Sequence, residues 1–290
     1  MSGERTDHSP SDSASDSASD RSEAGSGASV SGAADRGPSV HEANTAAEWE
    51  RHAAWWQDGF TDGADSEYVE QIIPLVAQWL PAAATVLDIG AGDGQIARMA
   101  AANGHVSIAV ERSESQIAVG CERDAANAGV AAVRWVRGDA VRLPLADDSV
   151  DAAVLCLVIE HIEDFEAAFA EVARVLRPGG RMLVLMNHPI LQTPNSGWID
   201  DHILEEQYWR IGPYLVETTT SEEVGRDVSL TFHHRPLGRY LNAAADLGLN
   251  LTAFIEPAPP SGFLAETPEY SDADTIPRLL LTVHTLAGGR

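Results

Sequence analysis

The middle of the chain alternates short apolar runs with stretches of helical periodicity. The apolar runs have the length and composition of buried strands. They occupy residues 85–89, 105–110, 131–136, 150–155 and 181–186. Between the last two runs, Phe165, Phe169 and Val172 recur at helical spacing, and Arg-Pro-Gly-Gly at 177–180 ends that helix. Strands that alternate with helices predict a parallel sheet covered by helices on both faces.

The last third of the chain adds an edge to this sheet. A polar and aromatic stretch runs from 187 to about 232, and a helix is expected at 236–247. Strand-like runs follow at 250–256 and 278–286. These two strands can pair as an antiparallel edge.

The beginning of the chain has a different composition. Residues 1–41 are rich in Ser, Asp, Ala and Gly and contain almost no large apolar side chains. Such a segment cannot offset the entropy of ordering, so we predict a disordered tail. Two helical runs follow it. The apolar face expected on the second run consists of Val69, Ile72, Ile73, Val76 and Leu80.

One segment carries candidate chemistry. The strand at 85–89 contains Asp88 and leads into a turn with Gly90, Gly92 and Gly94. Glycine adopts backbone angles that other residues avoid and lets a ligand approach the main chain, and the helix that follows points its amides at the same place. This arrangement predicts a nucleotide pocket.

A second acid supports this prediction. Glu111 ends the second strand about 20 residues after the turn, where doubly wound folds bind ribose hydroxyls. Nicotinamide-dependent enzymes and methyltransferases share this feature. The dinucleotide pattern has Gly or Ala where this chain has Gln95, and Asp88 two places before Gly90 also points away from it.

Four further segments follow the glycine turn in order. They are Glu111 after the second strand, 138–140 (Gly-Asp-Ala) after the third, 143–151 before the fourth and 174–180 before the fifth. With them, residues 85–186 resemble the class I S-adenosylmethionine (SAM)-dependent methyltransferases. The segment at 234–237 is similar to the small-molecule branch of that family, the methyltransferase type 11-like group. The resemblance implies an α/β fold, a Rossmann-like, doubly wound, mostly parallel seven-stranded sheet with helices on both faces and an antiparallel last strand.

The resemblance also implies which residues bind S-adenosyl-L-methionine. Asp88 and the glycine turn would hold the methionyl amino and carboxylate groups, and Glu111 would bind both ribose hydroxyls. Asp139 would accept from the adenine amine, the Ala140 amide would donate to a ring nitrogen, and carbonyls near Cys156 would meet the amino group. The expected cofactor set is Asp88, Gly90, Ala91, Gly92, Gly94, Glu111, Arg112, Asp139, Ala140, Cys156 and Leu157.

Several of these residues have an alternative structural role. Gly92 and Gly94 can serve tight packing of a strand against a helix, and Asp139 can cap a turn. Asp147 and Asp148 are expected to form a turn rather than to act as catalytic acids.

A general base is optional, because methyl transfer from an activated sulfonium depends largely on positioning and desolvation. A phenol, hydroxyl or acidic carbon acceptor can pass its proton to a histidine. The candidate catalytic residues are His161, which follows Glu160 just after the fourth strand, and His234; His188 and His233 are the alternatives.

Aromatic residues outside the core are candidates for the acceptor side. Trp49, Trp55 and Trp56 lie in the first helical run, and residues 187–234 hold four more such candidates. The four are Trp198, Tyr208, Trp209 and Tyr214. They can form a lid over a flat or apolar acceptor, or they can be core residues.

The charge of the chain bears on its partners. There are 44 acids against 19 bases, all arginine, for a formal net charge of -25. Such a surface repels phosphate backbones, so nucleic acid is not expected as a partner. Residues 157–160 read Leu-Val-Ile-Glu, without the Asn-Pro-Pro-Tyr type motif of many methylases that modify base amino groups.

Neither a metal site nor a membrane span is predicted. Cys121 and Cys156 are expected to be buried and reduced, and no cluster of Cys and His has zinc-ligand spacing.

No stretch is long and apolar enough to span a bilayer, and no signal pattern opens the chain, so we expect a cytoplasmic protein. The oligomeric state is not determined by these features.

We therefore expect a tail at 1–41 and a methyltransferase domain at 42–290. Its parts are a helical lid (42–82), a SAM-binding core (85–186), a substrate-side insertion (187–234) and a C-terminal sheet edge (235–290). The predicted function is SAM-dependent O-, C- or N-methylation of a small-molecule acceptor. Alternatives are a non-catalytic SAM-binding regulatory protein, an aminopropyltransferase and an RNA or protein methyltransferase.

Overall fold

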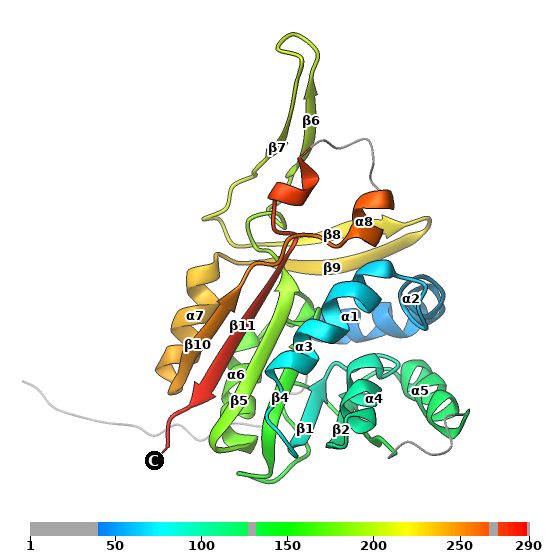
Figure 1. Cartoon of the computed structure of the whole chain (residues 1–290), viewed down its shortest axis with the longest axis vertical. Coiled ribbons are helices and arrows are strands. Elements are labelled where there is room, and N and C mark those ends of the chain that lie inside the picture. The colour runs from blue at the N-terminus through cyan, green and yellow to red at the C-terminus, as the bar shows by residue number, and fades with distance from the viewer. Residues whose placement is uncertain (1–39, 127–131, 267–271, 289–290) are drawn as a thin grey trace, which may run out of the picture. The chain divides into compact units, whose positions relative to one another are not determined.

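A seven-stranded sheet forms the centre of the computed structural model, which describes residues 40–126, 132–266 and 272–288 (Figure 1). The strand order is β10–β11–β5–β4–β1–β2–β3. The strands are β1 (Thr85–Ile89), β2 (Val106–Glu111), β3 (Arg134–Arg137), β4 (Val150–Cys156), β5 (Leu176–Asn187), β10 (Leu249–Ile255) and β11 (Leu279–Leu286). The first five are parallel, and β11 runs antiparallel to β5 and β10. The predicted fold class is confirmed.

Each face of the sheet carries its own layer of helices, because alternate strand residues point to opposite faces. The helical elements concerned are η1 (Tyr68–Ile72), α3 (Ile73–Trp79), α4 (Gln95–Ala102), α5 (Glu114–Ala126), α6 (Phe165–Val175) and α7 (Leu237–Asp246). Leu87 and Leu155 pack with α6 and α7, whereas Val86 and Val154 pack with η1, α3 and α4. Helix α5 contacts β3 and β2.

Helix α6 forms where its periodicity predicts it. The Asp164 side chain caps its first turn by accepting from the Ala167 amide at 2.9 Å. Phe165, Phe169 and Val172 lie on its core face and are fully buried. Burial of such side chains contributes roughly 1.5 to 3 kcal/mol each, so this helix is held chiefly by its packing on the sheet.

The helical run before β1 departs from the expected apolar face. Val69, expected to be buried, is 51% exposed, and Tyr68 is buried in its place. The cause is the π-helical turn η1, whose extra residue per turn changes which side chains face the core. Pro74 at the start of α3 has no N–H for the usual i→i−4 bond, which favours this wider turn.

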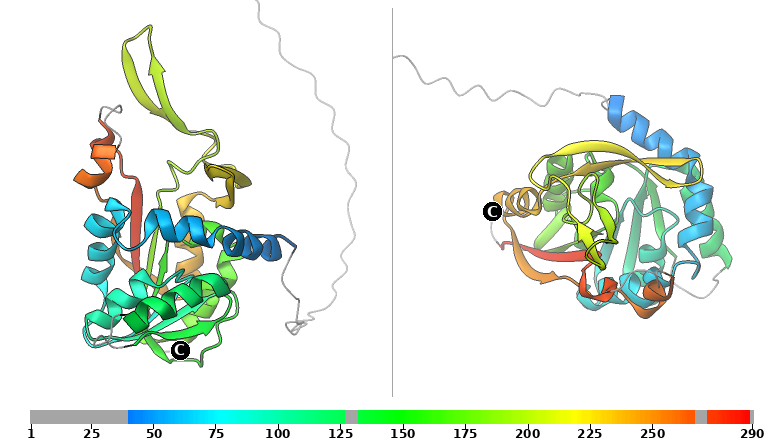
Figure 2. Two further views of the ribbon diagram at one scale, coloured as in Figure 1. Left: turned by 90° about the vertical axis from the view of Figure 1, so that its right-hand side faces the viewer. Right: turned by 90° about the horizontal axis from the view of Figure 1, so that it is seen from above.

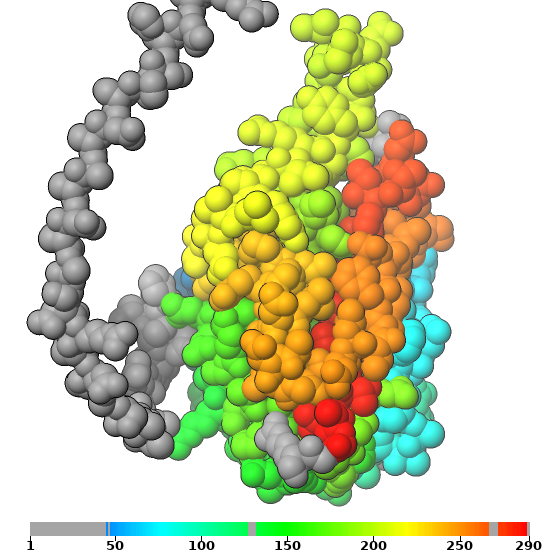
Figure 3. Space-filling model, turned by 90° about the vertical axis from the view of Figure 1, so that its left-hand side faces the viewer, coloured from blue at the N-terminus to red at the C-terminus, as the bar shows by residue number. Residues whose placement is uncertain are grey.

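The stretch at 187–234 forms two antiparallel hairpins that its polar and aromatic composition did not predict. They are β6 (Gly197–Asp201) with β7 (Glu206–Arg210), and β8 (Thr218–Gly225) with β9 (Val228–His234). The β6–β7 hairpin extends away from the sheet (Figure 2), and Figure 3 shows it standing clear of the surface formed by α7 and β10. Its tip exposes two apolar side chains, since Ile203 is 91% and Leu204 64% exposed.

The β8–β9 hairpin instead lies over the carboxyl ends of the sheet strands, next to the N-terminal helices (Figure 1). These helices are α1 (Val40–Arg51) and α2 (Ala53–Phe60). Trp49 and Trp55 pack against Leu230 and Phe232 of β9. The remaining elements are η2 (Ile159–His161), α8 (Ser261–Glu266) and η3 (Ala273–Thr275).

Three expectations about the chain's extent and surface can be compared with these elements. Residues 1–39 of the predicted tail lie outside the described residues. Helix α1 begins at Val40 and so includes the last two residues of the predicted tail, 40 and 41. Cys121, expected to be buried, is exposed because it lies on the outer side of α5. Within the described ranges, no helix has the length and apolarity needed to cross a membrane.

The contact between α5 and β3 leads to a prediction about the free energy of unfolding. A Cβ at Gly120 of α5 would lie 2.2 Å from Cζ2 of Trp135, whereas a Cβ at Gly59 of α2 meets nothing within 4 Å. Overpacking typically costs about 1 to 3 kcal/mol. We expect Gly120→Ala to lower the free energy of unfolding by about that amount, and Gly59→Ala to raise it by roughly 0.5 to 1 kcal/mol through helix propensity. Urea unfolding measures both; equal stability of the two variants would contradict the packing.

Candidate functional site

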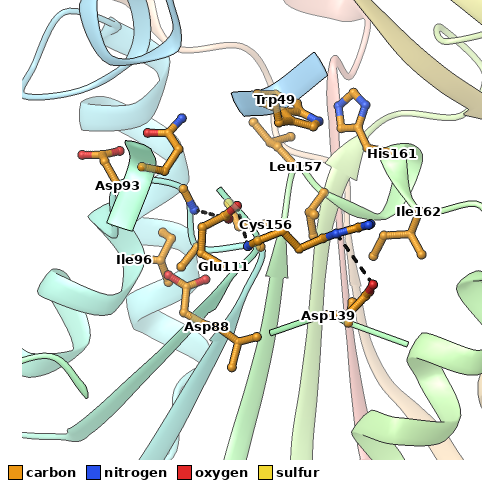
Figure 4. Close-up of a pocket in the computed structure, with 18 of the residues that line it drawn as sticks. Trp49, Asp88, Asp93, Ile96, Glu111, Asp139, Cys156, Leu157, His161 and Ile162 are labelled. Atoms are coloured by element: carbon orange, nitrogen blue, oxygen red, sulfur yellow. Dashed lines mark hydrogen bonds and ion pairs between the residues drawn. The ribbon is translucent and has the colours of Figure 1, made fainter. Parts of the chain in front are cut away.

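A cavity of about 1140 Å³, part of it open to solvent, lies at the carboxyl ends of β1, β2, β3 and β4. This is the place where strand order reverses between β1 and β4, and open α/β sheets bind their ligands there. Of the residues expected at the cofactor, all except Gly94 line it. Figure 4 shows Asp88 and Glu111 in its lower part and Trp49 with His161 across from them.

The turn after β1 fits tightly against the rest of the cavity floor. Gly90 has φ +66°, and a Cβ there would lie 2.4 Å from Cγ2 of Val158. The amides of Gly90 and Ala91 both donate to the Val110 carbonyl, which joins the turn to the end of β2. A side chain at position 90 is therefore excluded by both conformation and space.

Gly94 allows tight packing of a strand against a helix, which is the structural alternative considered for it above. It has φ +89°, and a Cβ there would lie 2.6 Å from the ring of Trp135. Gly94 precedes the first residue of α4, so the close approach sets where that helix starts. Its neighbours Asp93 and Gln95 line the cavity instead.

Glu111 is the most fully bonded acid of the site. Its Oε2 accepts from the Gly92 amide at 2.9 Å, and its Oε1 accepts from the Arg112 and Ser113 amides at 2.8 Å each. Burial raises the pKa of this carboxyl above its ordinary value, although the three amides act in the opposite direction. The carboxylate is thus held rigidly, and Oε2 has one lone pair left for a ligand hydroxyl.

Asp88 lies deeper and is 2% exposed. One oxygen accepts from the Ala97 amide of α4 at 3.0 Å. Burial raises the pKa of Asp88 to about 7, with smaller contributions from the charges of Glu111 and Asp93. A buried acid of this kind is characteristic of a functional site and favours a cationic ligand group.

Asp139 closes a turn and also borders the cavity. Its Oδ1 accepts from the Val141 amide at 3.2 Å, which closes a turn after β3. Its Oδ2 lies 3.6 Å from Nε of Arg112, and this pair borders the cavity (Figure 4). Ala140 lines the cavity beside it.

The end of β4 brings strained backbone to the cavity. Leu157 has φ +50°, unusual for a residue with a branched side chain, and its amide donates to the Leu185 carbonyl at 2.8 Å. Burial raises the pKa of the Cys156 thiol well above its ordinary value. A raised pKa favours the neutral thiol over the thiolate.

Aromatic side chains form the opposite wall. Trp49 of α1 and Trp56 of α2 line the cavity, as does Tyr68 of η1. The rings of Trp49 and His161 meet edge to face with centroids 5.0 Å apart. The part of the aromatic lid predicted from Trp49 and Trp56 is therefore present at the cavity.

The other predicted lid residues lie elsewhere. Trp55 contacts Gly225 of the β8–β9 hairpin. Trp198 and Trp209 pair with each other across the β6–β7 hairpin, and Tyr214 packs on His234. Neither these residues nor Tyr208 lines the cavity.

The structure separates the candidate histidines. His161 lines the cavity, and its Nδ1 lies 2.8 Å from the Thr231 carbonyl. Since a carbonyl only accepts, Nδ1 carries the proton in this bond, and in the neutral ring Nε2 then has the lone pair. His234 lies outside the cavity wall and bonds through Nε2 to the Tyr214 carbonyl at 2.8 Å. Its neighbour His233 contacts Thr219, and His188 contacts Glu256.

Sequence reasoning missed some cavity residues. Tyr68 was hidden by the π-helical turn, which moves it to the buried face. Gln116 at the start of α5 accepts a hydrogen bond from Gln57 of α2 at 2.9 Å, and no sequence pattern pointed to it. Among the described residues, no group of three or more His, Cys, Asp or Glu side chains is arranged to hold a metal ion.

Comparison with known proteins agrees with this geometry. Residues 87–184 match the model of a family described as a methyltransferase domain. The ubiquinone/menaquinone biosynthesis C-methyltransferase UbiE of Dinoroseobacter shibae is 37% identical over 123 residues, which are 41% of this chain and 48% of that protein. A demethylmenaquinone methyltransferase of Mycobacterium marinum is 40% identical over 99 residues, or 34% and 39% of the two chains.

Solved structures share the fold over a longer stretch. An S-adenosylmethionine-dependent methyltransferase from Mesorhizobium loti superimposes with a TM-score of 0.64 at 28% identity, over 73% of this chain and 96% of that one. By sequence, the chain spans about half or less of the curated relatives it matches. The matched family region runs from β1 to β5 and so contains the strands whose ends build the cavity, and we conclude that residues 87–184 of this chain form a methyltransferase domain similar to that of S-adenosylmethionine-dependent methyltransferases.

Proposed function

We propose that this protein transfers the methyl group of S-adenosylmethionine to a small-molecule acceptor that carries an ionisable hydroxyl on a flat ring. The observation that carries the proposal is one cavity with two chemically distinct sides. Buried Asp88 and Glu111 lie beside a glycine turn on one side, and Trp49 with His161 lies on the other. The alternatives from other classes have no feature of the described residues that favours them.

The polar side of the cavity fits the cofactor. Glu111 has both oxygens fixed by amides, and the lone pair left on Oε2 suits a ribose hydroxyl. Asp88 suits an ammonium group, and the turn at 90–94 admits the close approach of a carboxylate to the main chain. Asp139 suits an exocyclic amine. Bound there, the cofactor supplies an electrophilic methyl group on a sulfonium.

The charge of the cavity limits which kinds of acceptor can bind. Asp88, Glu111 and Asp139 line it against one cation, Arg112, which Asp139 pairs. Acids at this density attract a sulfonium and an ammonium and repel an anionic acceptor. We therefore propose an acceptor without phosphate or carboxylate groups at the ring.

The relatives suggest the kind of ring. Two of them are named for methylation of quinone precursors, one explicitly as a C-methyltransferase. A hydroquinone fits the apolar surfaces of Trp49 and Trp56, and Nε2 of His161 is available to accept the hydroxyl proton. Loss of that proton enriches the neighbouring ring carbon in electrons. This carbon would bond the methyl group as the bond from methyl to sulfonium breaks, and it would then release its own proton to restore the aromatic ring.

Cofactor binding provides the primary test. Calorimetric titration of the full chain with SAM and its demethylated product is expected to show binding that NAD does not. Glu111→Ala removes charge-assisted contacts and is expected to raise the dissociation constant for SAM at least about tenfold. Glu114→Ala, which removes an exposed acid of α5, is the control and leaves affinity unchanged. Unaltered affinity in a folded Glu111→Ala protein would refute this role.

The raised pKa of Asp88 predicts a pH dependence. Burial raises this pKa from 3.8 to about 7. Raising the pH from about 6 to about 8 ionises the carboxyl and is expected to tighten SAM binding up to about tenfold, through attraction of the ammonium. Asp88→Asn keeps an acceptor for the Ala97 amide and should remove most of the dependence.

The same shift affects stability with a definite sign. Because the folded pKa lies above the unfolded value of 3.8, the contribution of Asp88 to stability is full below that pH and is lost as the pH rises through about 7. Asp88→Asn is therefore expected to gain stability relative to the native chain at about pH 8, and not at about pH 4. A constant difference across this range in urea unfolding would contradict the shifted pKa.

His161 is the residue to test with an acceptor. In an assay of product release with simple hydroquinones, His161→Gln is expected to lower kcat about 100-fold or more while leaving SAM affinity unchanged. His234→Gln lies outside the cavity wall and should retain most activity if it folds. Equal losses in the two variants would argue against His161 as the base.

A further inference from the structure

Helix α1 carries two acids, on either side of Trp49, that reach different parts of the molecule. Glu48 accepts from Thr231 of β9 twice, from its amide to Oε2 and from its hydroxyl to Oε1, each at 3.1 Å. Glu50 reaches the start of α5, where the Ser113 hydroxyl donates to Oε2 at 2.7 Å. These two acids attach the same helix to the two sides of the cavity.

The residue that Glu48 holds is also the residue that holds His161. The Thr231 carbonyl accepts the Nδ1 proton of His161 at 2.8 Å. Strand β9 pairs only with β8 in the sheets formed by the described residues, and the amide and carbonyl of Thr231 lie on its other edge. Without Glu48, the Thr231 amide would lose its acceptor, on the edge of β9 that pairs with no strand of the described residues.

The imidazole is enclosed by rings that fix its plane but not its protonation. Trp49 meets it edge to face, and the Phe232 ring lies with its centroid 4.5 Å from that of His161. Neither ring distinguishes the two neutral forms of histidine. Only the bond to Thr231 does so, because it requires a proton on Nδ1.

We propose that Glu48 is a positioning residue that, by clamping Thr231, fixes His161 in its Nδ1–H form and leaves Nε2 free to accept the acceptor's proton. The proposal rests on the proposed function for the use of Nε2. The clamp itself consists of contacts within the chain, so it can be tested without an acceptor. It also gives α1 a role beyond covering the cavity.

Glu50 supplies a matched control on the same helix. It is exposed, it anchors α1 as Glu48 does, and the Ser113 amide behind it donates to Glu111 on the cofactor side. If α1 merely needs anchoring, loss of either acid has the same consequence. If the clamp is specific, only loss of Glu48 changes which ring nitrogen of His161 carries the proton.

The test is long-range proton–nitrogen NMR of the imidazole side chains in the full-length ¹⁵N-labelled protein, with His161→Gln to assign the signal. The native protein is expected to show His161 protonated on Nδ1. Glu48→Ala should introduce the second neutral form, whereas Glu48→Gln, which still has an oxygen for the Thr231 amide, should restore the native pattern. Glu50→Ala should retain the native pattern.

Thr231→Val is a second, milder variant in case Glu48→Ala does not fold. It removes the hydroxyl contact and keeps the amide and carbonyl, so it should shift the His161 signals in the same direction by a smaller amount. A native His161 protonated on Nε2, or an unchanged pattern in folded Glu48→Ala, would overturn the proposal. So would equal changes in Glu48→Ala and Glu50→Ala.

Kinetics then separate this proposal from the proposed function. With a hydroquinone that the native enzyme methylates, Glu48→Ala should lower kcat about tenfold or more, Glu48→Gln should recover it, and SAM affinity should stay unchanged in both. If the native protein neither binds SAM nor turns over, the proposed function fails, while the tautomer pattern still decides whether the clamp exists.

Discussion

The buried carboxylate of Glu111 is the interaction on which the site depends. It receives three main-chain amides from two separate loops, one after β1 and one after β2. A buried acid with unsatisfied oxygens would cost several kcal/mol, so these loops are held to one geometry by the need to solvate it. The loop after β2 continues into Ser113, which bonds Glu50 of α1. One acid thus joins the glycine turn, the end of β2 and the helical cover.

Electrostatics explain why the cavity favours a cationic ligand. Asp88 and Glu111 both have pKa values raised by burial, so the cavity without a ligand holds its carboxylates at a cost. A cation that enters recovers part of this cost. Stability and binding therefore oppose each other at the same two residues, as is usual for preorganised sites.

The cover is attached at several points, which distinguishes it from a loosely hinged lid. Beside the two acids of α1, Gln57 of α2 bonds Gln116, and Arg123 of α5 bonds both Thr61 and Asp93. The bonds of Gln57 and Thr61 join α2 and the residue after it to α5, and the pair of Arg123 with Asp93 joins α5 to the glycine turn. The β8–β9 hairpin completes the enclosure from the other side through Phe232 and Thr231.

The amino-acid sequence alone determined the sheet and most of the residues that line the cavity at its carboxyl edge, because these depend on local patterns: apolar runs, glycines at 90–94, and acids at strand ends. Gly90 and Glu111 could be assigned since a positive φ and a strand-end acid each leave a local signature. Only the tertiary structure decided the acceptor side. Tyr68 came to the cavity through a π-helical turn, and His161 was separated from His234 by contacts 20 to 70 residues away in the chain. Such contacts depend on how hairpins and helices pack on one another, so the spacing of residues along the chain does not predict them.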